Sequence, residues 1–94
     1  MDFTYKGKPV LPTKTALNEL DEINLNLYEV PEILEKGFEI RKRKGNIIER
    51  GIQRGNKVIN VVAVDLGDYY KLIHVGEFTL SKKFKKLMRM KNGI

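Results

Sequence analysis

The sequence has no cysteine, no tryptophan and a single histidine, His74. Without cysteine there is no disulfide, no thiolate nucleophile, and no zinc ribbon or iron–sulfur cluster. One histidine gives no metal-ligating pair, and the sequence has neither an EF-hand loop nor a glycine-rich phosphate loop. The sequence therefore predicts no metal site and no cofactor, and it argues against nucleotide-hydrolysing classes.

Long hydrophobic runs are also missing. No apolar run approaches the ~18 residues that suggest a membrane span, and the first ten residues lack the apolar stretch of a secretory signal. We therefore expect no membrane partner and a cytoplasmic location. With 94 residues, 41% of them hydrophobic, the chain has enough apolar surface for one core, and residues 1–94 are predicted to form a single domain.

The charge is distributed unevenly along the chain. Residues 1–40 carry four lysines against eight acids, a net charge of −4. Residues 41–94 carry fourteen lysines and arginines against four acids, a net charge of +10. This asymmetry predicts one face for an anionic partner, and the alternative is a solvated, lysine-rich surface that serves solubility.

Two helices are predicted in the first half. The first covers residues 14–22 with Thr13 as its N-cap, because apolar residues recur there at helical spacing. The second lies within residues 27–36, with Tyr28 or Glu29 as its N-cap, Pro31 in its first turn and Gly37 as a left-handed stop. Both helices precede the basic part of the chain.

Strands are predicted at both ends of this helical region. Residues 3–11 read as a short strand or hairpin that ends at Pro12. After Gly37 the pattern alternates, and four antiparallel strands are predicted: FEIRKRK, IIERGIQR, KVINVVAVD and YYKLIHVGEF. Gly45-Asn46 and Gly55-Asn56 are the expected two-residue turns, and KVINVVAVD, apolar on both faces, is the expected central strand. SKKFKKLMRMKNG predicts a basic C-terminal helix, which completes an α+β fold.

Two basic clusters are candidates for anion binding. Seven cations fall within seventeen residues of the predicted hairpins: Arg41, Lys42, Arg43, Lys44, Arg50, Arg54 and Lys57. They predict either a phosphate site or charged edge strands that resist aggregation. Four more cations crowd the start of the predicted C-terminal helix: Lys82, Lys83, Lys85 and Lys86. There they favour a phosphate or, equally, an acidic protein segment.

One pair of side chains is a candidate for proton transfer. Strict alternation in YYKLIHVGEF places His74 on the same face as Tyr70. A histidine beside a tyrosine in a cleft can donate or accept a proton near neutral pH. The alternative is a histidine that serves only packing or an edge.

Three soft motifs carry a resemblance to a known family: V-x-x-I-L-x-x-G, R-G-N-K-V-I-x-V-V and L-I-x-V, at residues 30–37, 54–62 and 72–75. With the predicted element order, they resemble the RelE/ParE-like toxin superfamily, in particular its BrnT-like and small archaeal and bacterial relatives. The resemblance implies a RelE-like fold over residues 13–90 and a metal-independent endoribonuclease toxin with an acidic antitoxin. By position, Lys42, Lys44, Arg50 and Arg54 resemble the family's phosphate-binding set, and Tyr70 or His74 its proton-transfer residue.

The sequence thus predicts an RNA-binding protein, acting on RNA alone or on the ribosome. The catalytic candidates are Arg50, Arg54, Tyr70 and His74. The RNA-binding candidates are Lys42, Lys44, Lys57, Lys82, Lys83 and Lys86. Two alternatives stay open: a non-catalytic module that docks an acidic, antitoxin-like protein segment, and a structural or regulatory domain. The residues also leave open whether the chain is an enzyme.

Overall fold

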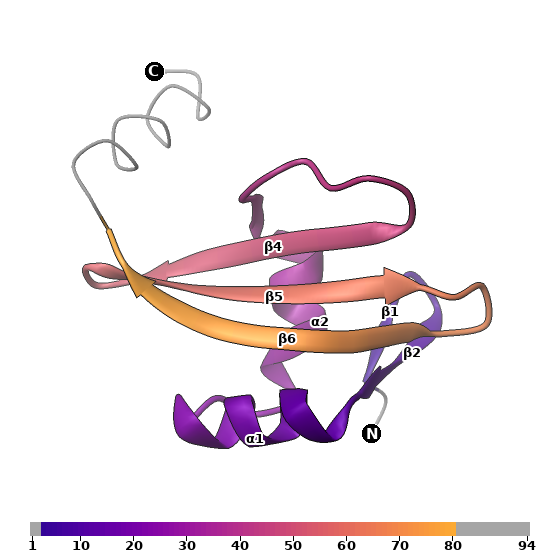
Figure 1. Cartoon of the computed structure of the whole chain (residues 1–94), viewed down its shortest axis with the longest axis horizontal. Coiled ribbons are helices and arrows are strands. Elements are labelled where there is room, and N and C mark those ends of the chain that lie inside the picture. The colour runs from indigo at the N-terminus through magenta and orange to yellow at the C-terminus, as the bar shows by residue number, and fades with distance from the viewer. Residues whose placement is uncertain (1–2, 81–94) are drawn as a thin grey trace.

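A computed structural model describes residues 3–80 (Figure 1). The described elements follow one another as β1 (Thr4–Tyr5), β2 (Lys8–Pro12), α1 (Lys14–Glu22), α2 (Glu29–Lys36), β3 (Phe38–Glu39), β4 (Ile47–Arg54), β5 (Lys57–Asp65) and β6 (Tyr70–Thr79). The α+β class is as predicted. The predicted C-terminal basic helix lies outside the described residues.

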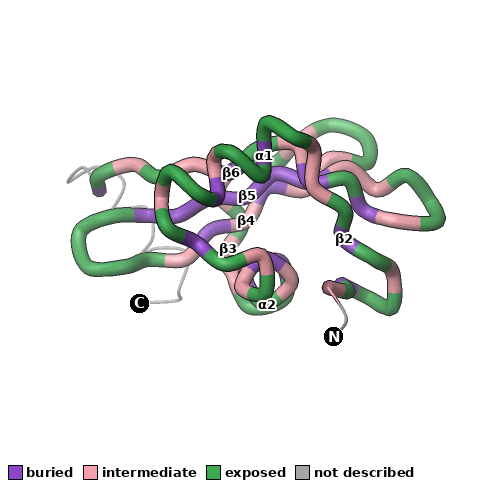
Figure 2. The backbone as a smooth tube through the Cα atoms, turned by 90° about the horizontal axis from the view of Figure 1, so that it is seen from below, coloured by how far each residue is buried: buried purple, intermediate pink, exposed green. Residues whose placement is uncertain are grey.

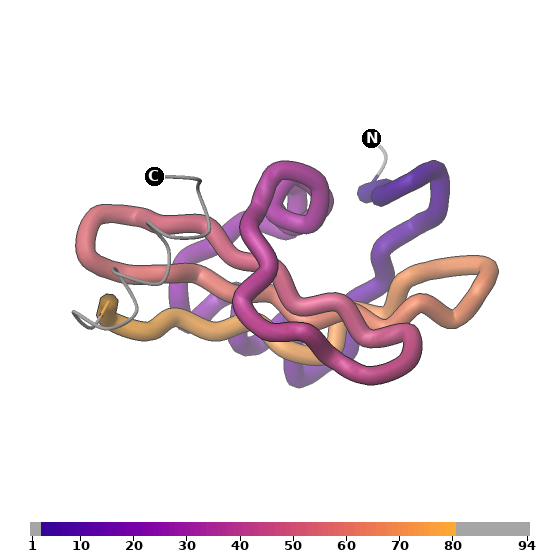
Figure 3. Tube along the Cα trace, turned by 90° about the horizontal axis from the view of Figure 1, so that it is seen from above, coloured from indigo at the N-terminus to yellow at the C-terminus, as the bar shows by residue number. Residues whose placement is uncertain are grey.

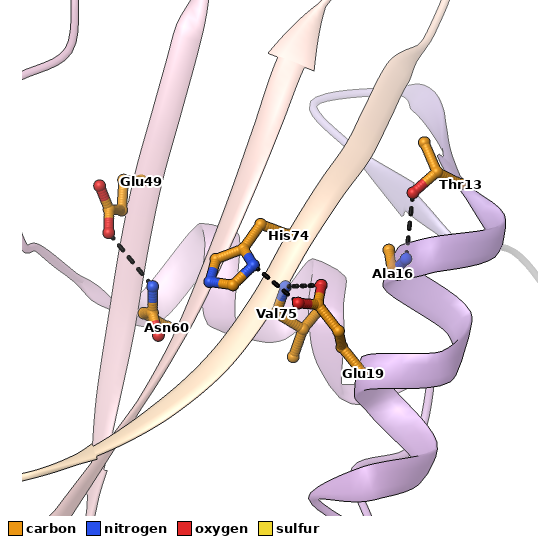
Figure 4. Close-up of polar contacts among 7 residues, drawn as sticks. All are labelled: Thr13, Ala16, Glu19, Glu49, Asn60, His74 and Val75. Atoms are coloured by element: carbon orange, nitrogen blue, oxygen red, sulfur yellow. Dashed lines mark hydrogen bonds and ion pairs between the residues drawn. The ribbon is translucent and has the colours of Figure 1, made fainter.

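Helix α1 occupies the predicted residues. The Thr13 hydroxyl accepts a hydrogen bond from the Ala16 backbone N–H at 3.0 Å, which satisfies one of the free amides of the first turn (Figure 4). Ala16 and Leu20, four residues apart, are both buried. The capping residue and the apolar spacing therefore define this helix in the way that the sequence indicates.

Helix α2 begins at Glu29 after the N-cap Tyr28, which is one of the two predicted caps, and it ends at Lys36, the predicted last residue. Pro31 lies in the first turn, as expected. The prediction of a left-handed stop is wrong: Gly37 has φ −70° and ψ 164°, an extended conformation open to any residue. Glycine is needed there for space, since a Cβ on Gly37 would lie 2.7 Å from the carbonyl oxygen of Gly51 in β4.

The prediction of a four-stranded antiparallel meander is wrong, and so is the RelE-like arrangement that was based on it. It has six strands in the order β1-β2-β6-β5-β4-β3 and is mixed, because β2 pairs with β6 in parallel. Strands β4, β5 and β6 do form an antiparallel meander, with β5 and β6 at the centre and the predicted turn at Gly55-Asn56. The N-terminal hairpin β1–β2 thus adds two strands at the edge of the meander.

The predicted strand FEIRKRK is the second error in the sheet. Only Phe38 and Glu39 pair with β4, and residues 40–46 form a loop that arches along the outer edge of β4 (Figures 1 and 3). Gly45-Asn46 is consequently the end of a longer loop and not a two-residue hairpin turn. The loop leaves the sheet where its arginines turn toward a carboxylate on β4, as described below.

The sheet has two distinct faces. Ile59, Val61 and Ala63 of β5 join buried residues of both helices in the main core. Val58, Asn60 and Val62 alternate with these residues along β5, so they face the other side, and they are also buried. Figure 2 shows the tube coloured as buried along the middle of β5. We call these sides the helix face and the second face. Helix α2 crosses behind the sheet, and α1 runs along the edge of β6 that β2 leaves unpaired (Figure 1).

A β-bulge changes the face of His74. Val62 pairs with His74 but Ala63 pairs with Leu72, so Ile73 is an extra residue in β6. Tyr70 and Leu72 therefore lie in the main core, whereas His74 lies on the second face with half of its side chain exposed. The prediction that Tyr70 and His74 share a face is wrong, because the alternation shifts by one residue between them.

An ion pair ties the parallel strand β2 to the meander. The Lys8 ammonium lies 2.6 Å from Asp65 Oδ1 at the end of β5, and 4.5 Å from the centre of the Tyr70 ring. The hydrogen bond from Lys8 lowers the pKa of Asp65 below its ordinary 3.8, and the same bond raises the pKa of Lys8 above 10.5. Both shifts favour the charged pair in the folded state.

This pair makes stability depend on pH in a predictable direction. A carboxyl whose pKa falls on folding contributes stability above its unfolded pKa and loses it as the pH falls through the folded value. The lysine contributes below its unfolded pKa and loses its contribution as the pH rises through the folded value. We expect the difference in Tm between the native protein and Asp65→Asn to be constant from about pH 5 to 9 and to shrink below about pH 4. Thermal unfolding followed by circular dichroism measures it, and a difference that persists to about pH 2 would contradict the assignment.

Candidate anion-binding site

The loop 40–46 and the adjoining part of β4 border an open pocket of about 120 Å³. Six of its lining residues are charged: Glu39, Arg41, Lys42, Arg43, Glu49 and Arg50. We call it the basic pocket. The loop brings in three of the four cations, and β4 supplies Arg50. Glu49 and Arg50 are neighbours on β4, so their side chains project to opposite faces of the strand, and both residues line the pocket.

Glu49 organises the arginines of this pocket. It lies on the second face, 4% exposed, with Oε1 at 3.1 Å from Arg41 Nε and 2.8 Å from Arg43 Nη1. Its other oxygen accepts a hydrogen bond of 3.2 Å from the side-chain amide of Asn60 (Figure 4). A buried carboxylate needs such partners, because an unpaired buried charge is costly. One negative charge thus holds two guanidinium groups, which leaves an excess of positive charge.

Arg50 supplies an unsatisfied donor. Its position pairs with Glu39 of β3 on one side and Val61 of β5 on the other, which places its side chain on the helix face. Of the buried side-chain nitrogens and oxygens within residues 3–80, Arg50 Nε alone has no hydrogen-bond partner. An unsatisfied buried donor costs ~1–3 kcal/mol, and an acceptor oxygen of a bound anion would satisfy it.

The four catalytic candidates are not brought together. Arg50 lines the basic pocket, but Arg54 is paired with Glu29 of α2 at the other end of β4. Tyr70 is buried, with its ring centre 5.1 Å from that of Tyr5 in β1. His74 lies on the second face, two strands away from β4. No pair of these residues therefore shares a face within hydrogen-bonding reach.

His74 has a defined partner of its own. Glu19 of α1 accepts the Val75 backbone N–H through Oε1 at 3.0 Å, and its Oε2 lies 2.9 Å from His74 Nδ1 (Figure 4). The carboxylate covers the edge of β6 that β2 leaves unpaired. The contact between His74 and Glu19 joins α1 to β6. It gives the histidine a structural role at the edge of this strand.

The RNA-binding candidates divide into three groups. Lys42 lines the basic pocket, and Lys44 is exposed on the same loop without lining it. Lys57 is at the opposite end of the sheet, 3.2 Å from Glu77. Lys82, Lys83 and Lys86 lie outside the described residues. Of the predicted catalytic and RNA-binding residues, Lys42 and Arg50 thus line the same pocket, together with Arg41 and Arg43.

Glu49 is the residue that sequence reasoning missed. It is the only carboxylate among the seven cations between Arg41 and Lys57, and that isolation is a usable signal. An acid in an alternating strand, flanked by cations on a preceding loop, is a natural partner for them. The sequence gave no indication of which of these cations would contact Glu49.

The described part of the chain holds no group of three or more histidine, cysteine, aspartate or glutamate side chains that could hold a metal ion. Among the helices in that part, none is long and apolar enough to span a membrane. No protein-family model, curated protein or solved structure matches the chain. The candidate function therefore depends on the geometry of the basic pocket.

Proposed function

We propose that the protein binds RNA, and that its basic pocket holds a phosphate group of the RNA backbone. The observation that carries this proposal is the convergence of four cations, from a loop and a strand, on one pocket whose acids are too few to neutralise them. Arginine forks and lysine ammonium groups are the donors that recognise phosphate in proteins. A net charge of +6 adds a long-range attraction for the polyanion.

The proposal is for a binding module and not for a nuclease. Metal-independent cleavage of RNA needs a proton-transfer group beside the phosphate that the cations hold. Tyr70 is buried in the main core and His74 is engaged by Glu19, both away from the basic pocket. Arg54, the other catalytic candidate, is occupied by Glu29.

Salt titration tests the proposal. Labelled single-stranded RNA is titrated with the full-length protein at rising KCl concentrations, and log K is plotted against log salt. Each phosphate contact adds ~0.7 to the slope, so a pocket with flanking cations should give a slope of about −1 to −2. Lys42→Gln should weaken binding several-fold and make the slope shallower, because it removes a pocket cation.

Lys36→Gln is the matched control. It also removes one exposed lysine, but from the C-terminal turn of α2, where Lys36 is 3.5 Å from Glu32. Equal losses from the two variants, or a flat salt dependence, would overturn the RNA proposal. Binding of a polyglutamate peptide in preference to RNA would favour an acidic protein partner. The RNA length is also measured after incubation of the same samples in EDTA. If the native protein cleaves the RNA and Arg50→Ala does not, the nuclease prediction is restored.

A further inference from the structure

The basic pocket differs from a simple basic patch in its charge balance and its size. Its lining holds four cations, Arg41, Lys42, Arg43 and Arg50, and two carboxylates, Glu39 and Glu49. The local net charge is therefore +2. A phosphodiester inside an RNA strand carries one negative charge and leaves half of that excess in place. A phosphomonoester carries about −1.5 to −2 near pH 7 and matches it.

The volume also favours a single group. The pocket measures about 120 Å³, several times the ~30 Å³ that one water occupies in the liquid. This is room for a phosphate group, whereas a nucleotide with its base and sugar needs a larger site. The bases of a bound strand would then lie outside, on the loop or the adjoining surface.

The donors suit the oxygens of a terminal phosphate. Arg41 is two-thirds exposed and held at one point by Glu49, so its remaining N–H groups can turn to a ligand. Arg50 Nε is buried without a partner, and a phosphate oxygen that draws the guanidinium outward would supply its acceptor. A terminal phosphate has three free oxygens, against two in a diester, and so satisfies more of these donors at once.

We infer that the basic pocket binds the terminal phosphomonoester of an RNA strand, so that the protein recognises phosphorylated RNA ends. This inference rests on the proposed RNA binding and adds the chemical group that the pocket selects. Phosphates at the 5′ and the 3′ end share this chemistry, and the experiment separates them.

The experiment compares RNAs of one sequence with a 5′-phosphate, a 3′-phosphate or hydroxyl groups at both ends. A hydroxyl-ended RNA that is one nucleotide longer has the same number of phosphates as the phosphorylated strands, and it controls for the number of phosphates. We expect at least one of the phosphorylated strands to bind about tenfold more tightly than this control. Inorganic phosphate should compete preferentially for that binding.

Two variants locate the effect. Arg50→Lys keeps the positive charge but loses the Nε donor and the planar fork, and it should reduce the preference for the phosphorylated end several-fold. Lys42 is an exposed residue of the pocket lining, and Lys42→Gln should do the same, whereas Lys44→Gln on the same loop should keep the preference.

The outcomes separate this inference from the proposal beneath it. Equal affinity for phosphorylated and hydroxyl-ended strands, with Lys42→Gln still weakening both, would overturn end recognition and leave RNA binding in place. If Lys42→Gln keeps the preference for the phosphorylated end as fully as Lys44→Gln does, the assignment of that preference to this pocket is overturned. No binding of any strand at low salt would overturn both.

Discussion

Glu49→Ala should lower the free energy of unfolding by about 2–4 kcal/mol, one of the largest effects expected for a single polar residue of this protein. The substitution removes the shared acceptor of Arg41 and Arg43, and it leaves the buried amide of Asn60 without its partner. An unsatisfied buried donor costs ~1–3 kcal/mol, and breaking a buried ion pair costs ~3–5 kcal/mol. The arginines are partly exposed and can turn to water, which keeps the expected loss below the sum of the two.

Urea unfolding followed by circular dichroism measures this loss, and Glu77→Ala provides the matched control. Glu77 is also a strand glutamate with one ion-pair partner, but its pair with Lys57 is largely exposed. Such surface pairs contribute ~0–1 kcal/mol, so the control should stay within that range. Glu49→Gln should fall between the two, because an amide oxygen can still accept from Asn60. Similar losses in Glu49→Ala and Glu77→Ala would refute the organising role of Glu49.

The local elements of this fold were predictable because their signals lie within a few residues. Thr13 caps α1 through an amide three residues away, and the Gly55-Asn56 turn requires only the positive φ of Gly55, +61°. The apolar residues on both faces of KVINVVAVD likewise identified the central strand β5. Each of these features depends on short-range stereochemistry or on a repeated pattern.

The errors came from contacts between distant residues. The parallel pairing of β2 with β6 joins Val10 to Tyr70, and no local pattern specifies such a partner. The bulge at Ile73 adds one residue, which is enough to reverse the side on which His74 lies. FEIRKRK has the alternation of a strand, but the attraction of its arginines to Glu49 occurs only once β4 is in place.

The candidate site shows the same division. Composition pointed to the cluster of cations, and it included Lys42 and Arg50, which do line the basic pocket. It could not show that Arg54 and Lys57 are neutralised by Glu29 and Glu77, which are distant in sequence. Charge patterns therefore located the cluster of cations, while the pairing of charges across the fold separates the cations that line the basic pocket from those held by distant carboxylates.

Gly37→Ala should lower the free energy of unfolding by about 2–3 kcal/mol, although the backbone of Gly37 is not strained. The added Cβ would meet the carbonyl oxygens of Ile33 in α2 and Gly51 in β4. Backbone atoms cannot rotate away as a side chain can, so the end of α2 must move off β4. Lys36→Ala, one residue earlier and exposed, should change stability by less than ~0.5 kcal/mol.

Gly37→Asn distinguishes this close approach from the left-handed stop that the sequence predicted. At a left-handed position asparagine is tolerated better than alanine, because its side chain bonds locally to the backbone. At a position limited by space, asparagine is larger and should destabilise at least as much as alanine. Urea unfolding of the two variants decides between these explanations, and a smaller loss for asparagine would support the stop. Because Gly37 directly precedes β3 and the loop of the basic pocket, both variants should also weaken RNA binding, whereas Lys36→Ala should weaken it no more than the control Lys36→Gln.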